Sequence, residues 1–164
     1  MATIHNNLSQ YDTANVPNAS SMKIGVVVAN WNTEITENLF LGCQEAFINS
    51  GGKKENLTRI TVPGSFELVY GANQLLKTQK DLDAVVVIGS VIQGETKHFD
   101  FVCQGVTQGI TQLNLTQDKP VIFCVLTDNN IEQSRDRSGG KHGNKGVEAG
   151  ITAIQMIALK QQLL

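Results

Sequence analysis

Cysteine is scarce in this sequence and carries no recognisable pattern. Only three cysteines occur among 164 residues, and none lies in a CxxC pair or at metal-ligand spacing from a histidine. An odd and scattered set argues against a disulfide framework and against a zinc site. We therefore expect no metal and a reducing compartment, which indicates a cytoplasmic protein; the cysteines are Cys43, Cys103 and Cys124.

Charge is also sparse. Charged residues make up 17% of the chain, the net charge is −2, and no block of basic residues is present. A chain of this kind lacks the electrostatic footprint of a protein that binds nucleic acid or an anionic membrane. We expect small-molecule partners instead, and a surface with so few charges suggests contacts between subunits.

Long apolar runs are missing as well. No stretch approaches the ~18 apolar residues of a membrane span, and the start "MATIHNNLSQYD" lacks the basic and apolar blocks of a signal peptide. With 41% hydrophobic residues, the composition is that of a globular protein. We expect one domain over residues 22–164. Residues 1–21 are polar and contain Pro17, and they predict an N-terminal arm that is flexible or docked on a neighbour.

What the chain does contain is a regular alternation of apolar runs and helical segments. The apolar runs are continuous, as expected for parallel strands covered on both faces, and the alternation is typical of βαβ units. We therefore predict an α/β fold, an open sandwich of a parallel sheet between two helical layers. The predicted strands are 23–30, 57–63, 82–92 and 119–127; the predicted helices are 33–49, 65–78, 96–114 and 144–161, with a short helical piece near 130–138.

Polar and aromatic residues follow each predicted strand. Ligands of open α/β sheets bind at the carboxyl ends of the strands, where helix N-termini and short loops converge. These segments therefore predict a single pocket at that edge; they are "NWNTE" (30–34), "PGSFE" (63–67), "QGETKH" (93–98) and "TDNN" (127–130).

The segment after the third strand is suited to binding an anion. Gly94 permits a tight turn, Thr96 is a good N-cap, and the free amides of a beginning helix bind phosphate. His98 would lie in the first helical turn, where the helix dipole favours the neutral imidazole that a general base needs. The alternative is a plain capping threonine and a surface histidine, and these residues alone do not decide between the two.

Three other positions are open to two interpretations each. Trp31, the only tryptophan, could stack on a planar heterocycle or pack in the core. Glu67 suits the first turn of a helix with or without a ligand. Arg135 and Arg137 cannot share one helix face, so one of them could reach a phosphate while the other stays on the surface.

Taken together and in order, the motifs resemble those of the 6,7-dimethyl-8-ribityllumazine synthases. The resemblance covers about residues 22–160, and five motifs in register make it highly specific. They are "NWN" (30–32), "VPGSFE" (62–67), "VIQGETKHFDFVC" (91–103), "PVIFCVLT" (120–127) and "GGKHGNKG" (139–146).

The resemblance implies a reaction and an assembly. The reaction condenses 5-amino-6-(D-ribitylamino)uracil with 3,4-dihydroxy-2-butanone 4-phosphate, releases phosphate and water, and needs no metal or cofactor. The fold would be flavodoxin-like, with a four-stranded parallel sheet and active sites between adjacent subunits of a pentamer. The compact glycine turn in 139–146 resembles that of members whose pentamers form an icosahedral shell. Riboflavin synthase is a candidate partner.

The resemblance also implies a role for individual residues. His98 would be the proton shuttle. Gln93 and Glu95 depart from the commonest pattern, and a Glu95 side chain pointing inward would weaken phosphate binding. Phosphate would be held by Gly94, Glu95, Thr96 and Arg137; the ribitylaminouracil would contact Trp31, Asn32, Ser65, Phe66, Glu67, Val91, Ile92 and Lys145, with Phe123 closing the pocket from the neighbouring subunit.

Two functions from other classes compete with this one. A flavin-binding module would use the same fold and Trp31, but it needs neither His98 nor a separate phosphate site. A shell protein without turnover would keep the assembly, although the presence of His98, Arg137 and Lys145 argues for activity.

Overall fold

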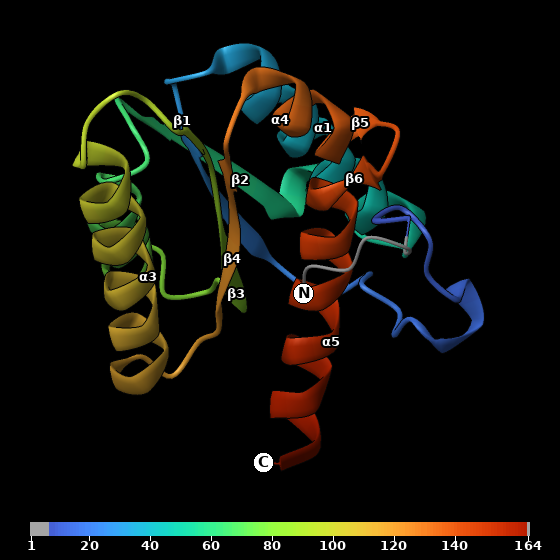
Figure 1. The fold of residues 1–164 in the computed structure, drawn as a ribbon. Helices are drawn as coiled ribbons and strands as arrows, with labels where there is room; N and C mark the ends of the chain where they lie inside the picture. Colours follow the sequence, from blue (N-terminus) through green and yellow to red (C-terminus); the bar gives the residue numbers. More distant parts are fainter. Residues whose placement is uncertain (1–6, 164) are drawn as a thin grey trace.

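The computed structural model describes residues 7–163, which form a sheet of four parallel strands between two helical layers (Figure 1). The strand order is β2-β1-β3-β4. This confirms the predicted α/β sandwich and the flavodoxin-like sheet. The strands are β1 (Ile24–Ala29), β2 (Leu57–Val62), β3 (Ala84–Ile92) and β4 (Val121–Asp128).

Five α-helices lie among the described residues, and four of them cover the sheet. α1 (Thr33–Asn49) and α5 (Lys145–Leu163) lie on one face, and α2 (Leu68–Thr78) and α3 (His98–Thr116) lie on the other (Figure 1). The short α4 (Ile131–Arg137) follows β4 at the carboxyl edge of the sheet. Every predicted helix is present, although α2 begins at Leu68 and not at residue 65.

The hydrophobic core is built around the two central strands, β1 and β3. All six residues of β1 are buried, as are the first seven of β3, because helices cover both faces there. Side chains that alternate along β3 enter different clusters: Val86 and Ile88 pack towards α1 and α5, while Val85 and Val87 pack towards α2 and α3. The edge strand β4 exposes Phe123 and Thr127.

A hairpin that was not predicted from the sequence connects α4 to α5. Its strands are β5 (Ser138–Gly140) and β6 (Gly143–Asn144), and Ser138 pairs with Asn144. Gly139 and Gly143 have φ angles of 119° and 83°, a left-handed region where glycine carries no steric penalty.

The described part of the expected N-terminal arm lies against its own chain. Ala19 is fully buried in the core beneath α1 and α5, and Tyr11 and Val16 pack against the same cluster. A short 3₁₀ turn, Thr13–Asn15, lies between them. The first six residues of the arm are outside the described residues.

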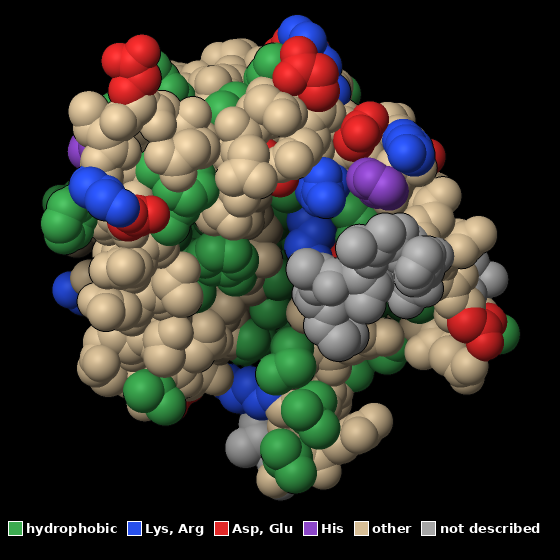
Figure 2. Space-filling view, viewed as in Figure 1, with side chains coloured by type: hydrophobic (Ala, Val, Ile, Leu, Met, Phe, Trp, Pro, Cys, Tyr) green, Lys and Arg blue, Asp and Glu red, His purple; other side chains and the backbone are tan. Residues whose placement is uncertain are grey.

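The face drawn in Figure 2 carries acidic and basic side chains interspersed with uncharged ones. Within residues 7–163, no helix is both long and apolar enough to cross a bilayer, and no three potential metal ligands cluster.

Candidate active site

A cavity of about 630 Å³ lies at the carboxyl ends of β1 and β3, beside the start of α3. Segments after three of the four strands form it, at the edge predicted for an open α/β sheet. The fourth predicted segment, 127–130, does not line this cavity. The predicted site residues that line it are Trp31, Ser65, Phe66, Glu67, Val91, Ile92, Gly94, Thr96 and His98.

Some lining residues were not singled out from the sequence. Ser90 precedes the two predicted β3 residues, and Phe99, Phe101 and Val102 belong to the first turns of α3. The aromatic spacing in "HFDFV" directly after His98 was a signal that could have found the α3 residues. Phe99, Phe101 and Val102 add apolar side chains to the lining of the cavity.

Trp31 is exposed over 72% of its surface and lines the cavity, so it is not a core residue. Two backbone hydrogen bonds hold its loop: Asn30 N donates to Val62 O over 2.8 Å, and Trp31 N donates to Pro63 O over 3.1 Å. An indole fixed at its backbone and open on its ring is suited to stack on a planar ligand.

Asn32 adopts a left-handed conformation directly before α1, with φ 59° and ψ 50°. Its side-chain Nδ2 donates to Ser90 O over 2.9 Å. The amide therefore joins the loop after β1 to the end of β3. Asn32 is not among the residues that line the cavity, so in this chain its visible role is to support Trp31 and β3.

Two buried hydroxyls at the cavity have no hydrogen-bond partner among residues 7–163. They are the Oγ atoms of Ser65 and Ser90. A buried hydroxyl without a partner costs free energy, and such groups in native proteins are commonly satisfied by a ligand or by water. The pair is consistent with a polar ligand seated at the end of β3.

The loop before α3 differs in detail from the prediction. Thr96 is not the N-cap, because Lys97 occupies that position with helical φ and ψ, and α3 begins at His98. Thr96 Oγ1 accepts only a long hydrogen bond, 3.4 Å, from His98 N. Glu67 likewise stands just before α2 and not in its first turn. Residues 93–98 are all exposed, His98 among them.

No contact within the described chain requires a glycine at position 94. A Cβ atom built there would have no atom within 4 Å, and Gln93 Nε2 donates to Gly94 O over 2.8 Å. The open space in front of Gly94 is what a ligand approaching the backbone would use.

Besides Asn32, four predicted residues do not line this cavity, and three of them lie on other elements: Phe123, Arg137 and Lys145. Phe123 lies on the edge strand β4 and is 37% exposed. Arg137 ends α4, and Lys145 begins α5. Glu95, although adjacent to Gly94, is not among the lining residues either.

The two arginines of α4 have different partners. Arg135 forms a bidentate ion pair with Glu34 of α1, with Nε–Oε1 2.8 Å and Nη2–Oε2 3.0 Å. Arg137 Nη1 donates to Gln133 O over 3.0 Å, and its Nε lies 3.9 Å from Asp128 Oδ1. Two nitrogens of Arg135, Nε and Nη2, donate to Glu34, whereas Arg137 makes only one hydrogen bond in the described chain.

Lys145 is largely covered, with 18% of its side chain exposed, and its Nζ lies 2.6 Å from Glu148 Oε1. The pair occupies the first turn of α5, where a carboxylate is favoured by the helix dipole.

The cysteines have no catalytic features. Burial raises the pKa of the Cys43 thiol to about 12 and also raises the pKa of Cys124. At Cys103, burial and the charge of Asp100 raise the pKa of the thiol. A thiol must ionise to act as a nucleophile, so none of the three is activated at neutral pH.

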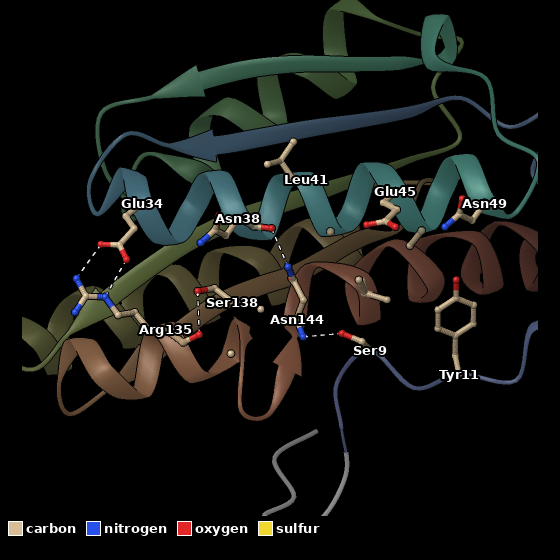
Figure 3. A pocket seen from close by; sticks show the side chains of 15 residues that line it. Ser9, Tyr11, Glu34, Asn38, Leu41, Glu45, Asn49, Arg135, Ser138 and Asn144 are labelled. Atoms are coloured by element: carbon tan, nitrogen blue, oxygen red, sulfur yellow. Dashed lines mark hydrogen bonds and ion pairs between the residues drawn. The ribbon is translucent and has the colours of Figure 1, made fainter.

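A second cavity, of about 710 Å³, lies over α1 and the β5–β6 hairpin (Figure 3). Among its described lining residues are Glu34, Arg135 and Asn144, and none is a predicted site residue.

Comparison with known proteins gives one consistent result. Residues 21–161 match the family model of 6,7-dimethyl-8-ribityllumazine synthase. A protein of that name from Christiangramia forsetii is 63% identical over 98% of this chain and 96% of its own length. One from Flavobacterium johnsoniae is 60% identical over 99% and 85%, and one from Parabacteroides distasonis is 55% identical over 96% and 98%. This chain therefore belongs to the 6,7-dimethyl-8-ribityllumazine synthase family.

Proposed function

We propose that the chain condenses 5-amino-6-(D-ribitylamino)uracil with 3,4-dihydroxy-2-butanone 4-phosphate to 6,7-dimethyl-8-ribityllumazine, releasing phosphate and water. This is the penultimate step of riboflavin biosynthesis. The observation that carries the proposal is the cavity at the sheet edge, which gathers Trp31, the buried Ser65 hydroxyl and His98 in a member of this family.

The ribitylaminouracil would occupy the part of the cavity between Trp31 and β3. Stacking on the exposed indole would orient the pyrimidine ring. The backbone of Val91 and Ile92 would contact its edge, and Ser65, Phe66 and Glu67 would line the ribityl chain, which is rich in hydroxyls. In this arrangement a ribityl hydroxyl satisfies the Ser65 Oγ atom that lacks a partner in the described chain.

The butanone phosphate would lie over the 94–96 loop. Backbone amides near the N-terminus of α3 bind anions, and the space in front of Gly94 admits the phosphate to the backbone. The Glu95 side chain is exposed and does not line the cavity, which favours its pointing away from the anion.

His98 would move the protons of the reaction. Imine formation, phosphate elimination and ring closure are chiefly proton transfers between two held reactants. The exposed His98 stands at the first position of α3 and lines the cavity. No covalent nucleophile is needed.

We propose that each site is completed by a neighbouring subunit of a pentamer. Phe123, Arg137 and Lys145 lie outside the cavity of their own chain, so a neighbour would supply them. The edge position of Phe123 on β4 suits it to contact another chain.

The proposed reaction is tested by mixing the purified chain with both substrates and following lumazine absorbance and phosphate release together. We expect both products in equal amounts, only when both substrates are present. A chain that binds riboflavin tightly but releases no phosphate would support a flavin-binding module instead.

Trp31 provides a test of the binding mode. We expect its fluorescence to be quenched, with saturation, by a ribityl-pyrimidine or by riboflavin, because stacking places the heterocycle against the only indole in the chain. Emission that does not respond to saturating ligand would contradict the stacking role. Tyr70, which is exposed on α2 and does not line the cavity, offers a matched site, since a Tyr70→Trp reporter in a Trp31→Phe background should not respond.

The assembly is a separate prediction. At 17.8 kDa per chain, a pentamer has a mass of about 90 kDa, and an icosahedral shell of about 60 chains has a mass of about 1 MDa. We expect the shell, because the turn at 139–143 is compact and would let pentamers approach. Light scattering coupled to gel filtration, with and without phosphate, measures this. A single species near 90 kDa in both buffers would exclude the shell, and a monomer would also exclude the shared site.

We also propose that residues 1–21 form an arm ahead of a single domain at 22–164 and that the enzyme works in the cytoplasm. Riboflavin synthase is the proposed partner, since it would consume the product.

A further inference from the structure

Arg137 and Lys145 flank the same point of the structure. They stand at the two ends of the β5–β6 hairpin, directly outside the pair formed by Ser138 and Asn144. Contacts that hold the Ser138–Asn144 pair in place therefore also determine the positions of Arg137 and Lys145. This matters because both are proposed to contact the substrates.

Asn144 is the residue at which the hairpin is tied to the rest of the chain. Its Nδ2 donates to Asn38 O of α1 over 2.9 Å, and its Oδ1 accepts from Gly146 N over 2.8 Å. Its backbone N donates to Ser9 Oγ over 2.9 Å. Figure 3 shows Asn144 between α1 and the segment that carries Ser9. One residue thus joins α1, the start of α5 and the N-terminal segment.

The position of the amide is fixed by close packing as well as by hydrogen bonds. A Cβ atom at Gly42 of α1 would lie 2.6 Å from Asn144 Cγ, and one at Gly146 would lie 1.8 Å from Leu39 O. No real Cβ contact is that short, so glycine at 146 lets α5 approach the backbone of α1, and glycine at 42 leaves room for the Asn144 amide. The Asn144 amide fills the space that remains.

The hydrogen bond to Gly146 also caps α5. Asn144 precedes the first helical residue, Lys145, and a side-chain oxygen there satisfies an amide that has no partner within the helix. Without it the first turn would fray, and the Lys145–Glu148 pair lies in that turn.

We propose that Asn144 is a positioning residue for the lumazine synthase reaction: its amide locks the first turn of α5 onto α1 and thereby holds Lys145 and Arg137 where the substrates bind. The inference rests on the proposed function. Asn144 does not touch substrate in this scheme. It acts through the two cations on either side of the hairpin.

Two substitutions separate the two side-chain bonds. Asn144→Asp keeps an acceptor for Gly146 N but cannot donate to Asn38 O, whereas Asn144→Ala removes both bonds. We expect Asn144→Asp to raise the KM for the butanone phosphate and the KM for the ribitylaminouracil about fivefold each, because Arg137 and Lys145 are proposed to contact one substrate each. Asn144→Ala should raise both KM values further, with kcat within about twofold of wild type. His98 remains in place in both variants, so the chemical step should be retained.

Two matched controls exclude simpler explanations. Asn38→Ala leaves the accepting carbonyl intact and should keep the wild-type KM. Ile154→Val removes one methylene from the buried part of α5, far along the helix from the hairpin, and should lower the thermal unfolding midpoint without raising KM. All assays are run well below the lowest unfolding midpoint.

The outcomes are distinct. A raised KM in both Asn144 variants, with unchanged controls, supports positioning; if Asn144→Ala does not fold, Asn144→Asp decides. Wild-type KM in Asn144→Asp, or an equal rise in Ile154→Val, would overturn the inference while leaving the proposed function intact. Failure of the wild-type chain to form lumazine would overturn both.

Discussion

Replacing His98 by alanine is expected to lower kcat by about 10²–10⁴-fold, the range typical of a lost general acid–base. The His98 ring is exposed at the first position of α3 and lines the cavity. Its loss should leave the binding of the ribitylaminouracil nearly unchanged, because the stacking and ribityl contacts lie elsewhere in the cavity. Steady-state kinetics of lumazine formation measures kcat, and fluorescence titration measures binding.

His142 supplies the matched control for this experiment. It lies in the turn of the β5–β6 hairpin, where its backbone O accepts from Leu8 N, a contact that alanine retains. His142→Ala should therefore show wild-type kcat. If His98→Ala were as active as wild type, His98 would be a surface residue and the proton transfers would belong to the substrates or to water.

Arg137→Ala is expected to raise the KM for the butanone phosphate by about 10–100-fold, the range for losing a hydrogen bond to a charged group. A guanidinium binds phosphate with two parallel N–H donors, so Arg137→Lys should recover only part of the affinity. Initial rates measured against each substrate in turn give the KM values. The KM for the ribitylaminouracil should change little.

Arg135→Ala is the internal control, and its structural basis is clear. Arg135 is held by Glu34 of α1, whose carboxyl pKa is lowered, chiefly by the hydrogen bond from Arg135. The Nε and Nη2 atoms of Arg135 are therefore already bound to Glu34 of the same chain. Equal effects of the two alanine substitutions on the KM for the phosphate substrate would show that the role given to Arg137 is misplaced.

The sheet and its helices were predictable because they depend on local pattern. Continuous apolar runs indicated β1 and β3, and the structure buries them as expected. The gathering of Trp31, Ser65 and His98 was also predictable, since parallel strands carry their following loops to the same edge.

The parts that were not predictable depend on contacts between distant residues. The bonds of Asn144 reach Asn38 and Ser9, which are 106 and 135 positions away in the sequence. Glu34, the partner of Arg135, is 101 positions away. Local spacing alone therefore could not tell which of Arg135 and Arg137 is engaged within the chain. The N-cap predicted at Thr96 was wrong, because the first helical hydrogen bond of α3 runs from Phe101 N to Lys97 O and makes Lys97 the cap. Residue preference does not determine where that bond forms.

Positions 31 and 32 differ in how freely they can be altered to change the substrate. The Trp31 side chain lines the cavity, and its backbone φ is not in the left-handed region. A library of substitutions at this position would therefore vary the size and polarity of the surface on which the ligand stacks. Asn32 is the one non-glycine residue with positive φ in the described chain. Most side chains there would cost about 1–2 kcal/mol, and the Asn32 amide donates to Ser90 O. Redesign of ligand preference should therefore diversify residue 31 and keep asparagine at residue 32.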